Sequence, residues 1–190
     1  MTKIYYTRHG KSFHNELYET IGEKAWTHPS VIGSSLTLKG IEQTKLLKKE
    51  IQKLEKIDLI LVSPLDRCLQ TVEQIVKDMA NVPEIISLDE LIEYEITDAA
   101  NYRKDKKELV RLFPFVNFKY IVDEFVTPSE DNRKLLSERI NSFKSFVSML
   151  SYNRILVVGH TSWLNMLFFN DPDCSELEHC KIYEYPGIKD

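Results

Sequence analysis

The chain has 190 residues, a length that suits a single α/β domain. Hydrophobic residues make up 43% of it, and a formal net charge of −4 argues against the basic surface of a nucleic-acid-binding protein. Three cysteines, no apolar run near the roughly 18–20 residues that cross a bilayer and no recognisable signal peptide predict a cytoplasmic protein without a membrane span.

The N-terminal part of the chain predicts a strand, a polar loop and a helix. Residues 4–7 form a short apolar run typical of a buried strand, and residues 11–15 are predicted as a polar loop. Thr37 suits the N-cap position of the helix that follows. One face of that helix carries Ile41, Leu46, Leu47, Ile51 and Leu54.

A second strand and helix follow directly. Residues 57–62 are continuously apolar apart from one aspartate, as expected of a parallel strand that is buried on both faces. Ser63 and Pro64 predict the start of a helix, because serine caps helix N-termini and proline fits the first helical position. Residues 83–88 are predicted as a third short strand.

The stretch 93–128 does not fit this alternation, because it mixes charged and aromatic residues. We predict that it is a partly helical insertion over the C-terminal edge of the sheet. The remaining predicted elements are a helix at about 131–151, a strand at 155–158, a short helix at 162–169 and an edge strand at 181–185. The whole pattern predicts one α/β domain over 1–190, a three-layer sandwich with a mostly parallel central sheet and helices on both faces.

Polar residues that could bind a ligand or take part in a reaction follow three of the predicted strands. Arg8 and His9 end the first strand, Ser63 and Arg67 follow the second, and His160 follows the fourth. The carboxyl ends of parallel strands lie at the same edge of a sheet, where open α/β proteins bind their ligands. Arginine is suited to phosphate, and histidine is a nucleophile or acid–base group near neutral pH. We therefore expect a phosphate-handling site at this edge.

Four segments carry a resemblance to a known family. Residues 8–15 (RHGKSFHN) are similar to the R-H-G-x-S-x-x-N signature of the histidine phosphatase superfamily, which includes the phosphoglycerate mutases. Residues 36–43 (LTLKGIEQ) resemble its L-T-x-x-G-x-x-Q helix start. Residues 63–71 (SPLDRCLQT) resemble its S-P-L-x-R-x-x-Q-T block, and residues 157–160 (VVGH) resemble the strand that carries its second histidine.

The resemblance implies a phosphohistidine intermediate on His9, with the ring held by a backbone carbonyl such as that of Gly10. It implies no metal and no cofactor, because arginines and a cationic His160 supply the positive charge. The phosphate-binding set that we expect consists of Arg8, Ser12, Asn15, Arg67, Arg103, His160 and Thr161. His28 and His179 are predicted at the surface.

The general acid of the resembled family lies in an L-x-E element after the third strand. Glu93 in Leu91-Ile92-Glu93 fits this position, so we assign it the role of proton donor. The sequence departs from the family pattern directly after Glu93, where a glycine and an aromatic residue are common. Glu90 and Glu95 therefore remain alternatives.

The expected activity is hydrolysis of a phosphate monoester, carried by a small molecule or a phosphorylated side chain. We expect no nucleic-acid or membrane partner, and the oligomeric state stays open. A mutase-type phosphotransferase is the alternative enzyme, disfavoured here because such mutases are usually longer than this chain. A non-catalytic module that binds a phosphorylated ligand is the alternative outside enzymes.

Overall fold

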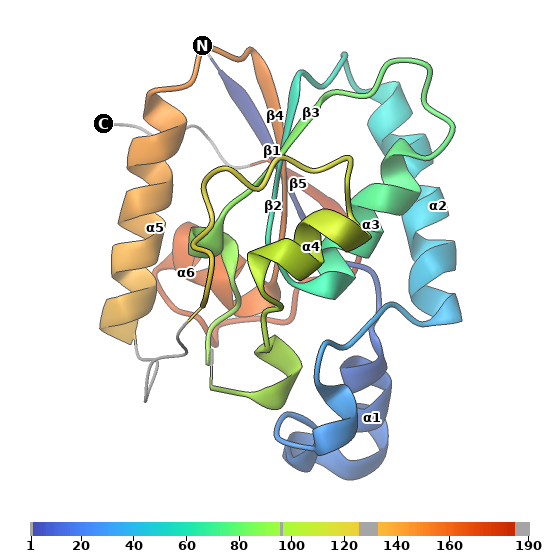
Figure 1. The fold of residues 1–190 in the computed structure, drawn as a ribbon, viewed down its shortest axis with the longest axis vertical. Helices are drawn as coiled ribbons and strands as arrows, with labels where there is room; N and C mark the ends of the chain where they lie inside the picture. Colours follow the sequence, from blue (N-terminus) through green and yellow to red (C-terminus); the bar gives the residue numbers. More distant parts are fainter. Residues whose placement is uncertain (1, 96, 126–132, 185–190) are drawn as a thin grey trace.

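The computed structural model describes residues 2–95, 97–125 and 133–184. Its centre is a five-stranded sheet in the order β3-β2-β4-β1-β5, shown in Figure 1. The strands are β1 (Lys3–Arg8), β2 (Leu59–Val62), β3 (Glu84–Ser87), β4 (Arg154–Gly159) and β5 (Ile182–Glu184). β5 pairs antiparallel with β1, whereas the other pairs are parallel. The predicted strands and the mostly parallel sheet are confirmed.

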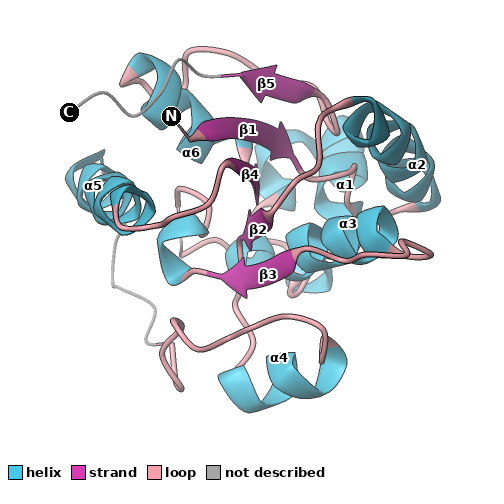
Figure 2. Ribbon diagram, turned by 90° about the horizontal axis from the view of Figure 1, so that it is seen from above, coloured by secondary structure: helices cyan, strands magenta, loops and turns pink. Residues whose placement is uncertain are grey.

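Helices cover both faces of this sheet (Figure 2). The α-helices of the described residues are α1 (Phe13–Ile21), α2 (Leu38–Lys53), α3 (Asp66–Val76), α4 (Lys106–Leu112), α5 (Arg133–Ser148) and α6 (Thr161–Phe169). α2 and α3 lie on one face, and α5 and α6 lie on the other. The predicted three-layer sandwich is therefore confirmed. Within the described residues, no helix is both long and apolar enough to span a bilayer.

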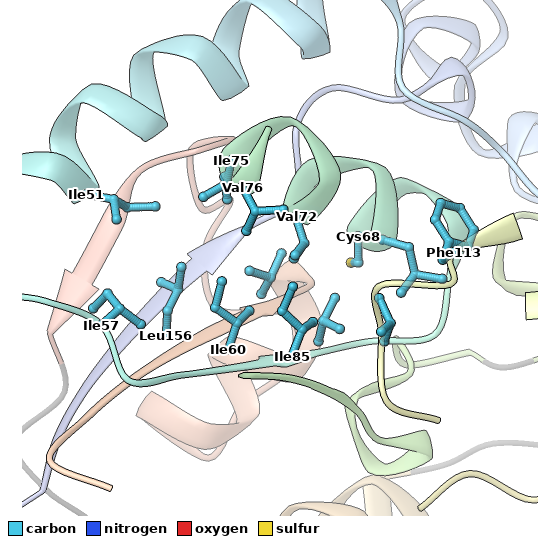
Figure 3. Packing of buried hydrophobic residues seen from close by; sticks show 14 of the residues in the cluster. Ile51, Ile57, Ile60, Cys68, Val72, Ile75, Val76, Ile85, Phe113 and Leu156 are labelled. Carbon is cyan, nitrogen blue, oxygen red and sulfur yellow. The ribbon is translucent and has the colours of Figure 1, made fainter. Parts of the chain in front are cut away.

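Two apolar clusters, one on each face, hold the layers together. Figure 3 shows the cluster under α2 and α3, in which Ile60 and Leu156 of the sheet meet Ile51 and Val72 of the helices. The opposite cluster joins the sheet to α5 and α6 around Trp163, which is fully buried. Successive strand residues point to opposite faces, so each strand contributes to both clusters.

One predicted helix start and one predicted loop differ from the structure. α3 begins at Asp66 rather than at Pro64, because Leu65 keeps an extended backbone with φ −77° and ψ 138°. α1 begins at Phe13 inside the predicted polar loop 11–15, so that loop prediction was wrong. The helix is stabilised locally, since Oδ1 of Asn15 accepts hydrogen bonds from both the backbone N–H and the hydroxyl of Ser12, at 3.1 and 2.7 Å.

The insertion 93–128 divides into two parts. Its first part includes a 3₁₀ turn, Ala99–Asn101, that lies at the C-terminal edge of the sheet against Arg67. Its second part contains α4 and packs beside the sheet, where Asn117 forms a bridge with Ile86 of β3. The predicted helical content is confirmed by α4, and residues 96 and 126–128 lie outside the described residues.

Candidate active site

The loop after β1 places His9 at the C-terminal edge of the sheet. Its backbone N–H donates to the carbonyl of Gly159 in β4 at 3.1 Å. Gly10 donates its N–H to the hydroxyl of Thr71 in α3 at 3.0 Å, and Lys11 donates to the side-chain oxygen of Gln43 in α2 at 2.8 Å. The threonine of segment 63–71 and the glutamine of segment 36–43 therefore hold the loop of His9 in place.

Two hydrogen bonds determine the tautomer of His9. Nδ1 lies 2.7 Å from the carbonyl oxygen of Gly10, so Nδ1 carries the proton and donates. Nε2 is then an acceptor, and Nε of Arg67 donates to it at 3.1 Å. Burial, followed by the charge of Arg67, lowers the pKa of His9 well below its ordinary value. The ring is therefore neutral, with a lone pair on Nε2.

Arg67, in the first turn of α3, lies at the centre of the site with 2% of its surface exposed. Besides His9, it donates from Nη1 to the carbonyl of Ala100 and from Nη2 to Oδ1 of Asn101, each at 2.7 Å. Nη2 also lies 3.2 Å from Nδ1 of His160. One guanidinium thus joins both histidines, which lie far apart in sequence.

His160 follows β4 and is fully buried. Its Nδ1 accepts from Arg67, so Nε2 carries the proton and donates to the hydroxyl of Ser63 at 2.8 Å. The two histidine rings lie 5.2 Å apart between centroids. Burial, followed by the charge of Arg67, lowers the pKa of His160 well below its ordinary value. The ring is neutral in this structure, so the expected cation requires a bound dianion beside it.

Glu93 lies against the N-terminus of α6. Its carboxylate accepts from the backbone N–H groups of Tyr94 at 2.8 Å, Trp163 at 3.0 Å and Ser162 at 3.3 Å. Burial raises the pKa of Glu93, and the N–H of Tyr94 and the charge of Arg67 oppose this rise. The net direction is upward, as a proton donor near neutral pH requires.

The other two glutamates differ in their surroundings. Burial raises the pKa of Glu90 too, but the cation that acts on its carboxyl is Arg139 of α5 rather than Arg67. Glu95 is exposed, with a left-handed backbone at φ 57°. The structure therefore brings Glu93 to Arg67 and leaves Glu90 and Glu95 outside this cluster.

Two buried donors of the predicted phosphate set lack a hydrogen-bond partner among the described residues. They are Nε of Arg8 and Oγ1 of Thr161. Arg8 is 7% exposed, and its Nη1 donates to the carbonyl of Leu177 at 2.6 Å. Buried polar groups in folded proteins almost always have partners, so orphaned donors beside two histidines suit an anionic ligand.

Ser12 is the N-cap residue of α1 and Asn15 lies in the first turn of this helix, next to the His9 loop. Their mutual hydrogen bonds use Oδ1 of Asn15 and leave its amide N–H₂ group for another acceptor. His14, beside them, is 5% exposed, and its ring lies 6.1 Å from that of His9. The contact of Ser12 and Asn15 with phosphate stays a prediction.

Arg103 does not join the site, contrary to the sequence-based assignment. Its guanidinium pairs with both carboxylate oxygens of Asp89, at 2.8 and 3.2 Å, and donates to the carbonyls of Lys104 and Val122. The side chain is fully buried in these contacts. Arg103 thus ties the insertion to the segment after β3, and all three nitrogens of its guanidinium take part in these contacts.

Two residues of the site were missed or misplaced by sequence reasoning. His179 was predicted at the surface, but it is half-buried, and its ring lies 5.4 Å from that of His9. Its Nδ1 lies 2.8 Å from the carbonyl oxygen of His9. Asn101, whose side chain contacts Arg67, was not among the site residues expected from the sequence.

The chain belongs to the histidine phosphatase superfamily (branch 1), whose family model matches residues 4–170. The matched range contains the segments 8–15, 36–43, 63–71 and 157–160. No sequence among the curated proteins is significantly similar to the chain.

Solved structures share the fold at low sequence identity. The ecdysone phosphate phosphatase of Bombix mori, solved with tungstate, is 14% identical with a TM-score of 0.65 over 98% of this chain and 90% of its own. The phosphoserine phosphatase of Entamoeba histolytica, solved with 3-phosphoglyceric acid, is 18% identical with a TM-score of 0.59 over 96% and 89%. The phosphoglycerate mutase of Thermus thermophilus is 16% identical with a TM-score of 0.54 over 96% and 92%.

Proposed function

We propose that this protein is a metal-independent phosphatase that hydrolyses phosphate monoesters through a phosphohistidine on His9. The observation that carries the proposal is the tautomer of His9, in which Nδ1 is held by the Gly10 carbonyl and Nε2 is an acceptor. A neutral imidazole with a directed lone pair is a competent nucleophile. The substrate is a small phosphorylated molecule or a phosphorylated side chain, and the location is cytoplasmic.

In the first half of the proposed reaction, the phosphate dianion accepts the hydrogen bond that Nε of Arg67 otherwise donates to Nε2 of His9. Nε2 then attacks phosphorus, and the bond from phosphorus to the leaving oxygen breaks. Glu93 gives its proton to that oxygen and becomes a carboxylate. Arg8, Arg67 and a His160 that gains a proton beside the dianion stabilise the charge on the equatorial oxygens.

In the second half, water attacks the phosphorus of the phosphohistidine. The Glu93 carboxylate accepts a proton from this water, the bond from phosphorus to Nε2 breaks, and inorganic phosphate leaves. Glu93 is protonated again, and His9 returns to its neutral form. The cycle consumes one water for each ester and needs no metal, because the guanidinium groups supply the positive charge.

The test is hydrolysis of p-nitrophenyl phosphate in excess EDTA by wild type, His9→Ala and His28→Ala. His28 is exposed, which makes it a matched control. We expect turnover by wild type and His28→Ala, no turnover by His9→Ala, and acid-labile phosphate trapped on the first two. Activity that EDTA abolishes and His9→Ala retains would contradict the mechanism. An inactive wild type that still binds phosphate would favour the non-catalytic binding module.

A mutase-type phosphotransferase is the second candidate. The similarity to a structure named phosphoglycerate mutase extends over 92% of that chain, so length does not separate the two activities. A mutase would pass the phosphate from His9 to a second hydroxyl compound faster than to water. Release of phosphate from the trapped phosphoenzyme, with and without 3-phosphoglycerate, distinguishes the two.

A further inference from the structure

Asn101 is a buried asparagine whose amide group has a partner on each side. It is 5% exposed, and its Nδ2 donates to the carbonyls of Tyr94 and Glu95, each at 3.0 Å. Only a donor can satisfy two carbonyl oxygens, so this end of the amide must be the N–H₂ group. Oδ1 consequently faces Nη2 of Arg67, from which it accepts at 2.7 Å.

The turn that carries Asn101 also determines the plane of the Arg67 guanidinium. The neighbouring Ala100 accepts from Nη1 at 2.7 Å through its carbonyl, while Nε reaches His9. Three contacts on three different nitrogens leave a planar group one orientation. The Ala100 N–H in turn donates to the carbonyl of Trp26 at 3.2 Å, which docks the turn against the segment after α1.

The same side chain reaches the segment that carries Glu93. Tyr94, whose carbonyl accepts from Asn101, is also the residue whose N–H binds the Glu93 carboxylate at 2.8 Å. Asn101 therefore connects the backbone of Tyr94 and Glu95 to Arg67. Loss of this amide would remove one of the contacts that orient Arg67 and both side-chain contacts to the backbone that follows Glu93.

We propose that Asn101 is a positioning residue, which orients Arg67 for phosphate and holds the segment of Glu93 in place. The inference rests on the proposed function for the roles of Arg67 and Glu93. This positioning role requires no contact between Asn101 and the substrate. Its effect on phosphate binding must therefore disappear when Arg67 can no longer be oriented, which a purely structural role does not predict.

The first measurement is calorimetric binding of inorganic phosphate to wild type, Asn101→Ala and Asn141→Ala. Asn141 is an exposed asparagine on α5 and serves as the matched control. We expect affinity about tenfold weaker for Asn101→Ala, the size of one hydrogen bond to a charged group, and no change for Asn141→Ala. In an Arg67→Lys background, which keeps the charge but loses the fork, Asn101→Ala should cost less than about twofold.

The second measurement compares kcat/KM for an alkyl phosphate with that for p-nitrophenyl phosphate. An alkoxide needs the proton of Glu93 more than a nitrophenolate does, so displacement of this segment lowers the alkyl-to-aryl ratio. We expect the ratio to fall about tenfold in Asn101→Ala and to stay unchanged in Asn141→Ala. Thermal unfolding checks that the variants are folded, and Asn101→Ser, which keeps a small polar side chain, replaces Asn101→Ala if that variant does not fold.

Unchanged phosphate affinity together with an unchanged alkyl-to-aryl ratio in a folded Asn101 variant would overturn the proposal. An equal loss in the wild-type and Arg67→Lys backgrounds would overturn it too, because the effect would then not pass through Arg67. If wild type hydrolyses no ester, the proposed function fails. The calorimetric comparison still decides whether Asn101 supports anion binding through Arg67.

Discussion

Nε of Arg67 donates to Nε2 of His9 at 3.1 Å, which places the arginine on the nitrogen that the proposed reaction uses. This contact and the Gly10 carbonyl on Nδ1 together hold His9 as a neutral ring with its lone pair directed at Arg67. The arginine that we propose as a phosphate ligand therefore also keeps the proposed nucleophile unprotonated. A phosphate oxygen that enters the site would replace Nε2 of His9 as the acceptor for Nε of Arg67, so the number of hydrogen bonds that the guanidinium donates would not fall during binding.

Glu93→Gln should lower kcat/KM for alkyl phosphates by about 10²- to 10⁴-fold, with a smaller loss for p-nitrophenyl phosphate. Burial raises the pKa of Glu93, so the wild-type carboxyl keeps its proton to a higher pH than an ordinary glutamate. Alkyl phosphate hydrolysis should then fall as the pH rises through this pKa, and the decline should be absent in Glu93→Gln. Steady-state kinetics across pH check both points. A loss in Glu90→Gln instead would show that the acid is the other glutamate.

His14→Phe should reduce the acid sensitivity of the fold. Burial, followed by the charge of Arg67, lowers the pKa of His14 to about 2, whereas the unfolded chain takes up this proton near pH 6.5. Because the unfolded state binds more protons, stability falls as the pH drops below about 6.5, by about 1.4 kcal/mol per pH unit for one such histidine.

Urea unfolding of wild type and His14→Phe at pH 7.5 and pH 5 measures this difference. The phenylalanine has no proton to gain, so its loss of stability between the two pH values should be smaller by about 2 kcal/mol. The comparison of the two pH values cancels the constant cost of removing the hydrogen bond between His14 and Ser12. Equal losses in both proteins would contradict the assignment of a neutral His14.

Gly40→Ala should destabilise the protein by about 1 to 3 kcal/mol and lower kcat/KM. A Cβ at Gly40 would overlap the carbonyl oxygen of Lys11, and backbone atoms on both sides must then shift. That shift moves the loop of His9. Gly159→Ala is the matched control, since a Cβ there meets no atom within 4 Å, and we expect a change within about 0.5 kcal/mol. Chemical denaturation and kinetics of both variants test the contrast.

Arg103→Leu should cost about 3 to 5 kcal/mol of stability and leave kcat nearly unchanged. The substitution leaves the carboxylate of Asp89, which is 17% exposed, without its bidentate partner. Arg111→Leu on the exposed side of α4 is the control, with an expected change within about 0.5 kcal/mol. A large loss of kcat with unchanged stability would restore Arg103 to the substrate site.

The alternation of apolar runs and helical faces was enough to predict the three-layer fold, because burial of each face follows directly from residue order. It was also enough to predict that Arg67, His9 and His160 meet, since parallel strands bring their carboxyl ends to one edge. The loop predicted at residues 11–15 failed because α1 is stabilised by the bonds between Ser12 and Asn15 rather than by an apolar face.

Only the tertiary structure showed that the charge of Arg67 acts on Glu93 and that the guanidinium of Arg103 pairs with Asp89. Loop residues such as Glu93, Arg103 and Asn101 have no periodic pattern, and their partners lie on segments distant in sequence. A charged side chain in such a loop pairs with whichever group the fold brings within hydrogen-bond distance. By itself, the sequence determined which chemical groups stand at the strand ends, and the packing of the insertion decided which further groups reach them.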